Sequence, residues 1–466
     1  MHFESQPPAA EDDRANSRPW FKELTRYHWF VLIVAALGWM FDTMDQQLFN
    51  LARKPAVTEL LTGAGGKAPS FQSVSNFEGY ATTIFMLGWA IGGLFFGVLG
   101  DRIGRARTML LTILAYSAFT GLSALSVGFW DFTFYRFLTG LGVGGEFAVG
   151  VALVAEVIPA RARPFALGWV QAMSAIGNMT AAVIAMILGH FEVGNSWRWM
   201  FVIGMAPALL VILIRRNLKE PEKWQAAVKA EDSEVGGQPA QRAGSIAELF
   251  GDPRWRRNAI VGMILGFAGV VGLWGIGFFS FSLVSAVFKK DLEAQGLSPE
   301  AVKGQLTWLV GLTSLLQNFG AFLGIYAFTR VTAYIGRRYA FAISFLLAMF
   351  ATAGTFWFID SVDDLFWMIP IMGFCQLTVF GGYAIYFPEL FPTRLRSTGT
   401  SFCYNVGRLV ASVGPLFLAL LTSQVFKEYD EITARRYAGV CMCAVFLIGL
   451  MVLPFAPETK GQPLPE

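Results

Sequence analysis

Charge is scarce in this sequence. Asp, Glu, Lys and Arg together make up 15% of the 466 residues, and hydrophobic residues make up 55%. A soluble domain carries about 25% charged residues. Folded in water, this chain would expose more apolar surface than its few charges could cover. The composition therefore excludes an ordinary soluble enzyme and favours a helical protein that crosses a membrane many times.

Histidine and cysteine are rarer still. The three histidines, His2, His28 and His190, are too scattered along the chain to indicate a metal site. All four cysteines lie within apolar runs and predict no disulfide framework: Cys375, Cys403, Cys441 and Cys443. The net charge of +3 does not indicate the clustered basic face that a nucleic-acid-binding protein needs. We expect no metal, no cofactor and no nucleic-acid partner.

The N-terminal segment does not resemble a cleaved targeting signal. Its first twenty residues, MHFESQPPAAEDDRANSRPW, are polar and acidic and contain no apolar core. A secretory signal peptide requires such a core of 7–15 apolar residues. The segment is therefore predicted to be a cytoplasmic tail.

Twelve apolar runs follow, each near the roughly 20 residues that a bilayer core requires. They form two sets of six, separated by a stretch too polar to enter lipid. The runs start near His28, Phe77, Thr108, Asp131, Ala166 and Ser196, and then near Asn258, Gln305, Arg338, Asp363, Ser397 and Thr433. The predicted organisation is a cytoplasmic tail (1–27), a six-helix bundle (28–216), a cytoplasmic linker (217–257), a second six-helix bundle (258–456) and a cytoplasmic tail (457–466).

The basic residues predict the orientation. With the N-terminus inside, the inner segments hold about twice as many Lys and Arg residues as the outer loops. This asymmetry places both termini in the cytoplasm of a protein of the cell (inner or plasma) membrane.

The two halves share a motif at matched positions. Glu156-Val-Ile-Pro-Ala-Arg161-Ala-Arg163 follows the fourth run, and Glu389-Leu-Phe-Pro-Thr-Arg394-Leu-Arg396 follows the tenth. Both read E-x-x-P-x-R-x-R. A second motif after the second run has a degraded copy in Tyr334-Ile-Gly-Arg-Arg338 after the eighth: Gly97-Val-Leu-Gly-Asp101-Arg102-Ile-Gly104-Arg105-Ala-Arg107. Matched copies indicate an internal repeat.

With these motifs and its six-plus-six layout, the sequence resembles the major facilitator superfamily of secondary transporters over nearly its whole length. Further motifs resemble the metabolite–proton symporter branch, which includes sugar porters and organic-acid carriers: Arg136 in YRFLTGLGVGGE, Glu220-Pro-Glu222 and Pro457-Glu-Thr-Lys-Gly461. The resemblance implies an all-α membrane fold of two pseudo-symmetric six-helix bundles. It also implies alternating access and a monomer that binds a small molecule and protons within the lipid bilayer.

The sequence differs from the sugar porters at positions that indicate the class of substrate. Where sugar porters carry a Gln-Gln pair in the seventh span, this chain reads GLWGIGFFSFSL. Three other motifs resemble aromatic-acid, nicotinate and sialate carriers instead: Asp42-Thr-Met-Asp45, Gly144-Gly145-Glu146 and Asn405-Val-Gly-Arg408. We therefore expect an organic acid as the substrate. A sugar symporter and an uncoupled facilitator are the alternatives.

Few full charges fall deep inside the predicted spans: Asp42, Asp45, Arg136, Glu146 and Arg408. Each costs at least ~2.5 kcal/mol at the bilayer centre, so such residues are candidates for function. Asp42 and Asp45 lie three residues apart on one helix face, at a depth comparable to that of Arg136. An Asp–Arg pair between spans 1 and 4 is predicted, with Asp42, Asp45, Arg136 and Glu146 as proton-coupling residues. The alternative is a static ion pair that only fixes helix packing.

Substrate contacts are predicted from polar side chains at similar depth. The Arg408 guanidinium can bind a carboxylate with two parallel hydrogen bonds; pairing with Glu146 or with backbone carbonyls is the alternative. The other candidates are Gln171, Asn178, Gln317, Asn318, Gln376 and Phe41. Each of these could instead serve helix packing.

The motif loops are predicted to form a cytoplasmic gate. The resemblance implies ion pairs between loop and helix ends that hold the outward-facing state; a solvated basic loop is the alternative. The gate residues are Gly97, Asp101, Arg102, Gly104, Arg105, Glu156, Arg161, Arg163, Glu389, Arg394 and Arg396.

Other function classes fit the sequence less well. Gly140-Leu-Gly-Val-Gly144-Gly145 matches the dinucleotide fingerprint, but it lies inside an apolar span rather than after a strand. The segment GAGGKAPS lacks the spacing of an ATP-binding loop. A nutrient sensor on a transporter scaffold is a further alternative, and no catalytic constellation suggests an enzyme.

Overall fold

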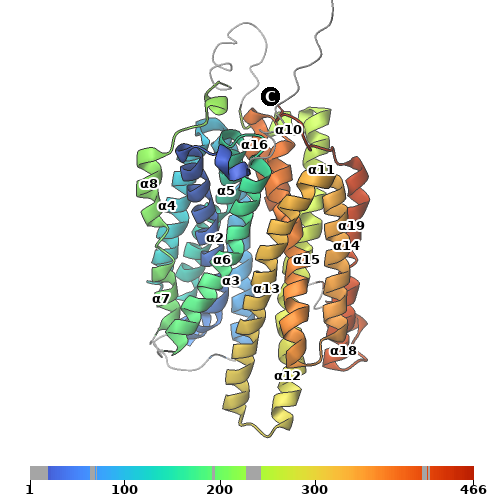
Figure 1. Ribbon diagram of the computed structural model, residues 1–466. Helices are drawn as coiled ribbons and strands as arrows, with labels where there is room; N and C mark the ends of the chain where they lie inside the picture. The colour runs from blue at the N-terminus through green and yellow to red at the C-terminus, as the bar shows by residue number, and fades with distance from the viewer. Residues whose placement is uncertain are drawn as a thin grey trace, which may run out of the picture.

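The computed structural model describes residues 19–62, 69, 71–190, 195–226, 243–411, 417 and 420–465. Helices occupy the positions of all twelve predicted spans (Figure 1). The first six spans are α2 (Arg26–Thr62), α3 (Phe71–Ile103), α4 (Arg105–Ser123), α5 (Phe129–Val157), α6 (Arg163–His190) and the pair α7 (Ser196–Ile203) and α8 (Ala208–Asn217).

The second six spans repeat this layout after a short helix, α10 (Ile246–Gly251). Span 7 is divided by a π-helical segment, and span 12 consists of two short helices. The elements are α11 (Pro253–Val270), η3 (Val271–Gly277) and α12 (Phe278–Ala294), α13 (Pro299–Ile335), α14 (Arg337–Phe358), α15 (Val362–Glu389), α16 (Arg396–Ala411), and α18 (Glu431–Met442) with α19 (Val445–Val452). In the part of the chain that the structure describes, nine helical segments are long and apolar enough to cross a membrane. The three other spans are α4, the pair α7 and α8, and α16. The fold is all-helical.

The two halves lie side by side and pack in the same way internally (Figure 1). Helix α3 packs closely against α5, and its counterpart α13 packs against α15. The halves meet along two seams, α6 against α13 and α3 against α16. A space between these seams can therefore be reached by side chains from both halves.

Glycines allow the closest of these contacts. A Cβ on Gly88 or Gly92 of α3 would clash with the α5 backbone at Phe137 and Leu141, and Gly140 and Gly144 of α5 meet the α3 backbone likewise. Small residues spaced by four let two membrane helices approach in this way. The glycines that match a dinucleotide fingerprint thus lie inside α5 and serve helix packing.

The helices α4 and α14 begin at equivalent glycines. Gly104 precedes α4 with a φ of 109°, and Gly336 precedes α14 with a φ of 89°. Glycine adopts positive φ without the steric cost that a Cβ imposes. The degraded second motif therefore keeps the one residue that the sharp turn requires.

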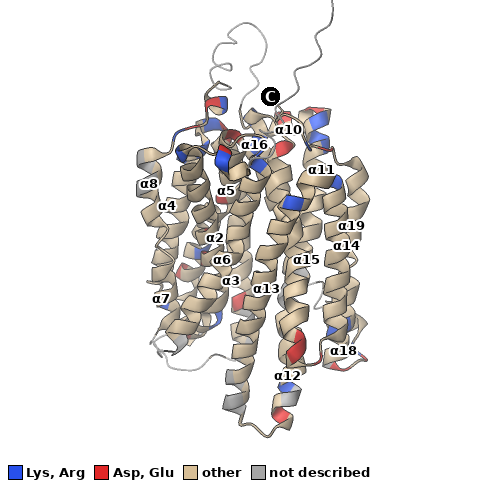
Figure 2. Ribbon diagram, in the orientation of Figure 1, with Lys and Arg blue, Asp and Glu red and all other residues tan. Residues whose placement is uncertain are grey.

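Arg and Lys gather at one end of the molecule (Figure 2). We call this the basic end; it contains the turns from α3 to α4, from α5 to α6 and from α15 to α16. The residues 1–18 of the predicted N-terminal tail and 227–242 of the predicted linker lie outside the described residues. Helix α11 begins at Pro253, five residues before the predicted start of the second bundle.

Candidate functional site

A pocket lies between the two halves, with walls from seven elements. Its lining is rich in amide and hydroxyl groups and includes a single formal charge, Arg408. Helix α2 contributes Trp39, Thr43, Gln46, Gln47 and Asn50, and α6 contributes Gln171, Ser174 and Asn178. The other half contributes Leu273, Phe281, Ser314, Gln317, Asn318, Leu377, Phe380, Tyr404 and Arg408.

The structure brings five of the seven predicted substrate residues to this pocket: Arg408, Gln171, Asn178, Gln317 and Asn318. Gln376 lies behind the wall, where it accepts a hydrogen bond from Gln317 (3.3 Å) and donates one to Thr352 (2.9 Å). Phe41 is half-buried against the hydrophobic core and is not among the lining residues. Gln376 therefore supports the pocket wall from behind, and Phe41 lies outside the pocket.

The prediction from sequence missed the α2 wall. Trp39, Thr43, Gln46 and Asn50 recur at intervals of three and four residues, which places them on one helix face. Polar residues at that spacing inside an apolar span indicate a helix face that lines a polar space. The charged residues Asp42 and Asp45, which lie in the same stretch, drew attention away from this pattern.

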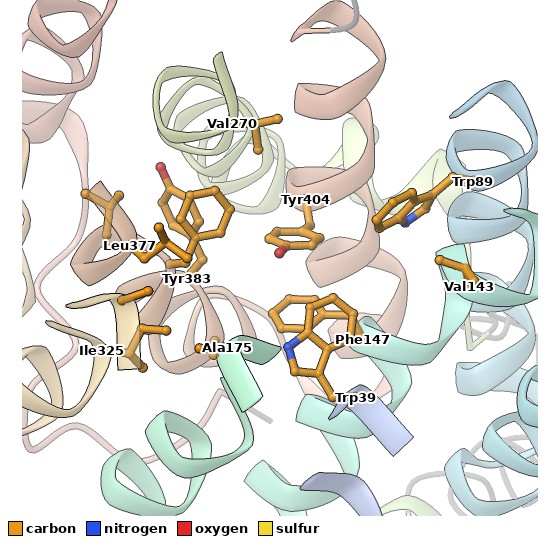
Figure 3. Packing of buried hydrophobic residues seen from close by; sticks show 14 of the residues in the cluster. Trp39, Trp89, Val143, Phe147, Ala175, Val270, Ile325, Leu377, Tyr383 and Tyr404 are labelled. Carbon is orange, nitrogen blue, oxygen red and sulfur yellow. The ribbon is translucent and has the colours of Figure 1, made fainter. Parts of the chain in front are cut away.

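Arg408 lies between two aromatic rings. Its guanidinium carbon is 4.0 Å from the ring centre of Trp89 and 4.2 Å from that of Tyr404. Figure 3 shows these rings on neighbouring helices, with Phe147 stacked on Tyr404 and Trp39 tilted against Phe147. The Nε and Nη1 atoms have no hydrogen-bond partner within the described residues. The alternative pairing of Arg408 with Glu146 is therefore not observed there, and this buried cation at the pocket wall keeps two unpartnered donor atoms.

Two amides join the halves across the pocket. Asn178 Nδ2 of α6 donates to Asn318 Oδ1 of α13 at 3.0 Å. Nearby, Gln46 Nε2 and Gln171 Oε1 are buried without a partner among the described residues. The residues that line the pocket therefore include an unpartnered amide donor and an unpartnered amide acceptor in addition to the arginine.

The predicted ion pair between spans 1 and 4 is formed by Asp45 and Arg136. Their Oδ2 and Nη2 atoms are 3.3 Å apart, and both side chains are fully buried. Thr120 of α4 donates to Asp45 (2.7 Å) and accepts from Arg136 (3.1 Å). Rings of three phenylalanines surround the guanidinium: Phe49, Phe85 and Phe201.

Asp42 and Glu146 have a different environment. Both are 1% exposed. Neither oxygen of Asp42 has a hydrogen-bond partner in the described chain, and Glu146 uses only Oε2, which accepts from Thr112 at 2.6 Å. Asp42 interacts electrostatically with Glu146, Asp45 and Arg408. The deep charges thus form one connected group, in which only Asp45 has a direct cationic partner.

At the basic end, Glu156 joins the two halves. It accepts from Arg105 of its own half at 3.0 Å and from Arg396 of the other half at 2.8 Å, with all three side chains fully buried. Arg105 also donates to the backbone carbonyl of Thr393 in the second half.

Asp101 makes a second connection across the basic end. It pairs with Arg105 at 2.9 Å. It also accepts hydrogen bonds from the backbone N–H groups of Ser397 and Thr398, at the start of α16. A carboxylate at a helix N-terminus is stabilised by the unpaired N–H groups and the helix dipole. In this structure the basic end is therefore closed between the halves.

The second half contains the equivalent cluster. Arg337 pairs with Glu389 at 2.9 Å. Glu458 accepts from the backbone N–H groups of Arg337 and Arg338 at the start of α14, as Glu220 does from Ala106 and Arg107 in α4. Partial burial acts to raise the pKa of Glu458, but hydrogen bonds from Arg337, Lys460 and Arg338 outweigh it, so its pKa lies below its ordinary value. Arg337 was missed as a gate residue, although its motif was recognised.

The remaining predicted gate residues are more dispersed. Gly97 lies against Ser401 of α16, and Gly104 against Glu220. Arg161 pairs with Glu23, Arg394 pairs with Glu248 at 2.7 Å, and Arg102 donates to the carbonyl of Ala243. Arg163 is buried near Glu389 and Arg396 and interacts with them electrostatically. Only Asp101, Arg105, Glu156 and Arg396 therefore form the fully buried centre of this cluster.

The family model described as Major Facilitator Superfamily matches residues 35–415 of the chain. The chain belongs to this superfamily. Its fold is also that of a solved structure, a proton:xylose symporter bound to 6-bromo-6-deoxy-D-glucose, with a TM-score of 0.71, 17% identity and coverage of 94% of this chain and 98% of that one.

Several curated relatives are transporters of small metabolites. The chain is 28% identical over 340 residues to the cis,cis-muconate transport protein of Acinetobacter baylyi, covering 72% of this chain and 76% of that protein. It is 25% identical to the niacin transporter of the same organism, with coverage of 94% and 96%. It is 24% identical to a sialic acid transporter of Escherichia coli, with coverage of 86% and 89%. The protein is therefore a multi-pass membrane transporter of small metabolites and not an enzyme.

Proposed function

We propose that this transporter moves a small organic acid together with protons, by alternating access around the central pocket. The observation that carries the proposal is Arg408, a buried cation with two free donors at the pocket wall. An unpaired guanidinium at that depth is costly. A substrate carboxylate that accepts a charge-assisted hydrogen bond from the guanidinium would offset this cost.

The electrostatic contact between Arg408 and Asp42 supplies a physical basis for coupling. When a carboxylate substrate binds Arg408, it neutralises the positive charge that favours ionised Asp42. Proton binding to Asp42 then becomes more favourable. By linkage, a bound proton favours substrate binding to the same extent. The anion and the proton would therefore load together, as symport requires.

The ion pair of Asp45 with Arg136 is proposed to transmit this change in charge to helix packing, since the pair joins α2 and α5. The cluster of Asp101, Arg105, Glu156 and Arg396 is proposed to act as the gate at the basic end. Half-on-half rocking about the pocket would then open the two ends in turn. We place the basic end in the cytoplasm of the cell membrane because positive charge is retained on that side.

Uptake by the purified protein in liposomes tests the proposal. Labelled cis,cis-muconate, niacin and sialic acid, the compounds named for the relatives, would be offered with and without an inward proton gradient. We expect an imposed gradient to drive accumulation of a carboxylate, and Asp42→Asn to lose that accumulation. Uptake that ignores the gradient would indicate an uncoupled facilitator.

A second candidate, a sugar symporter, is favoured by one observation. The pocket carries seven amide side chains from both halves, and amides bind hydroxyl groups well: Gln46, Gln47, Asn50, Gln171, Asn178, Gln317 and Asn318. Proton-driven uptake of labelled xylose, unaffected by competing carboxylates, would support this candidate instead.

A further inference from the structure

Helix α4 carries a column of hydroxyl groups that faces the deep carboxylates. Thr112, Tyr116 and Thr120 recur every four residues, and all three are 0% exposed. Residues four apart lie on one helix face, about 6 Å apart along the axis. Thr112 donates to Glu146 and Thr120 donates to Asp45, so Tyr116 lies between the two hydrogen-bonded carboxylates.

Tyr116 has no carboxylate or cation as a direct hydrogen-bond partner. Its hydroxyl is buried and makes no hydrogen bond of ordinary length and angle within the described residues; the hydroxyl of Ser117, the next residue on α4, interacts with it more weakly than the carboxylates do. Its strongest electrostatic interactions with charged groups are with Glu146 and then with Asp42, followed by Asp45. A buried hydroxyl without a partner is rare in a folded protein and calls for a physical reason.

The groups around Tyr116 are unpartnered in the same way. Glu146 Oε1 and both oxygens of Asp42 are buried without hydrogen bonds in the described part of the chain. Glu146 Oε1 lies where a Cβ on Gly38 would be. Gly38 and Asp42 are one turn apart on the same face of α2. Glu146 therefore fills the space on α2 directly beside Asp42, and both carboxyl groups interact electrostatically with Tyr116.

The nearby cations do not neutralise Glu146. Arg136 is engaged by Asp45 and Thr120, and Arg408 interacts electrostatically with Asp42 and Tyr404. An ionised carboxylate isolated from water and from cations is strongly unfavourable, so such a group takes up a proton instead. Three carboxylates thus share two arginines, and Glu146 is the one without either.

We propose that Glu146 is a second proton-carrying site, and that Tyr116 relays protons between it and Asp42. The inference rests on the proposed proton coupling. The relay requires Asp42 and Glu146 to come within hydrogen-bond distance of the phenol; the Tyr116 oxygen then accepts the proton of the Asp42 carboxylic acid while the Tyr116 O–H proton passes to the Glu146 carboxylate. One O–H bond breaks and one forms at the phenol, so Tyr116 is neutral before and after. The Asp42 that results is ionised and is stabilised by Arg408.

This arrangement separates proton storage from substrate binding. Neither Glu146 nor Tyr116 lines the pocket, whereas Arg408 does. A transported monocarboxylate would be accompanied by protons on both Asp42 and Glu146. Two protons with one anion carry a net positive charge, so the membrane potential would drive uptake.

Infrared difference spectroscopy tests the proposal without a substrate. The C=O stretch of a buried carboxylic acid in purified full-length protein disappears when the group loses its proton, and it shifts when the proton exchanges for deuterium. We expect Glu146→Gln to remove one such band and Asp42→Asn to remove another. Tyr116→Phe, which keeps the ring, should retain the Glu146 band and slow its exchange at least about tenfold.

Ser123→Ala is the matched control. Ser123 is a buried hydroxyl on α4 that donates to the backbone carbonyl of Phe119. It should leave bands and exchange unchanged, and melting temperatures of all variants would show that they fold. A Glu146→Gln spectrum identical to that of the unmodified protein would refute the second site. Unchanged exchange in Tyr116→Phe would refute the relay. Uptake that ignores the proton gradient would instead refute the proposed function, whatever the spectra show.

Discussion

Glu156 and Arg396 form a fully buried ion pair of 2.8 Å that joins the two halves of the transporter at the basic end. The same oxygen of Glu156 also accepts from Arg105. Glu156 therefore contacts one guanidinium group from each half, and Asp101 shares the charge of Arg105. Any motion that opens this end must separate Glu156 from Arg396.

Replacing this carboxylate should open the basic end. Breaking one partner of a buried pair costs about 3–5 kcal/mol because the remaining charge is left unpaired. In Glu156→Gln, Arg105 and Arg396 would repel one another, so the closed state should lose population. A cysteine introduced in the pocket by Ser174→Cys, in a Cys441→Ser background, reports access from the opposite end. An impermeant thiol reagent added at that end should label it several-fold more slowly in Glu156→Gln.

The control is Arg436→Gln, which removes a pair with Asp360 that lies within one half. It should leave the labelling rate as it was. Equal labelling rates in Glu156→Gln and the parent protein would show that this pair does not determine the closed state.

Replacement of Asp45 should distinguish the role of the Asp45–Arg136 pair in proton coupling from its role in helix packing. Asp45→Asn leaves Arg136 buried without its partner and should lower the free energy of unfolding by about 3–5 kcal/mol. The double variant Asp45→Asn with Arg136→Gln should regain much of that stability, because no charge is left unpaired. Proton-driven accumulation should be lost in both, whereas exchange of substrate across the membrane should persist.

Asp131→Asn serves for comparison, since Asp131 only accepts from backbone N–H groups at the start of α5. It should keep proton-driven accumulation. If the double variant regains accumulation together with stability, the pair has a purely structural role.

Most of the fold could be predicted from the sequence because the bilayer imposes a strict rule on length and polarity. The described residues of each predicted span are mainly helical, in one segment or more, and the repeated E-x-x-P-x-R-x-R motif located the same turn in both halves. The start of α11 at Pro253 was missed because Arg254, Arg256 and Arg257 make its first turn polar.

The site was predictable in its residue types but less so in its pairings. Depth along a helix placed Asp42, Asp45 and Arg136 at one level, yet it could not choose which aspartate faces the arginine. That choice depends on helix rotation, and therefore on Thr120 of α4, which bonds both Asp45 and Arg136. The α2 wall of the pocket and the position of Tyr116 also depend on packing between helices that are distant in sequence.

The helix cap formed by Glu458 should make stability depend on pH. Because the pKa of Glu458 is lowered in the fold, its contribution is complete above its ordinary pKa of 4.5 and is lost as the pH falls through the folded value. Glu458→Gln should therefore lower stability by about 1 kcal/mol at neutral pH. Melting temperatures at pH 7 and below pH 4 in detergent measure the difference.

The exposed Glu428, near the opposite end, provides the control. Glu428→Gln should leave the melting temperature unchanged at both pH values. A deficit in Glu458→Gln that is as large in acid as at neutral pH would mean that its charge does not stabilise α14.

The most direct test of the substrate class is Arg408→Lys. Lysine keeps the positive charge but loses the planar fork that binds a carboxylate with two hydrogen bonds, and it stacks less well between Trp89 and Tyr404. The affinity for a transported carboxylate should fall about 10- to 100-fold, equivalent to about 1.4–2.8 kcal/mol. The control is Arg330→Lys, which alters an arginine stacked on Phe165 and Tyr326 away from the pocket. This variant should bind the carboxylate with unchanged affinity. Binding measured by calorimetry on purified protein gives both affinities, and an unchanged value for Arg408→Lys would assign carboxylate recognition to the amides instead.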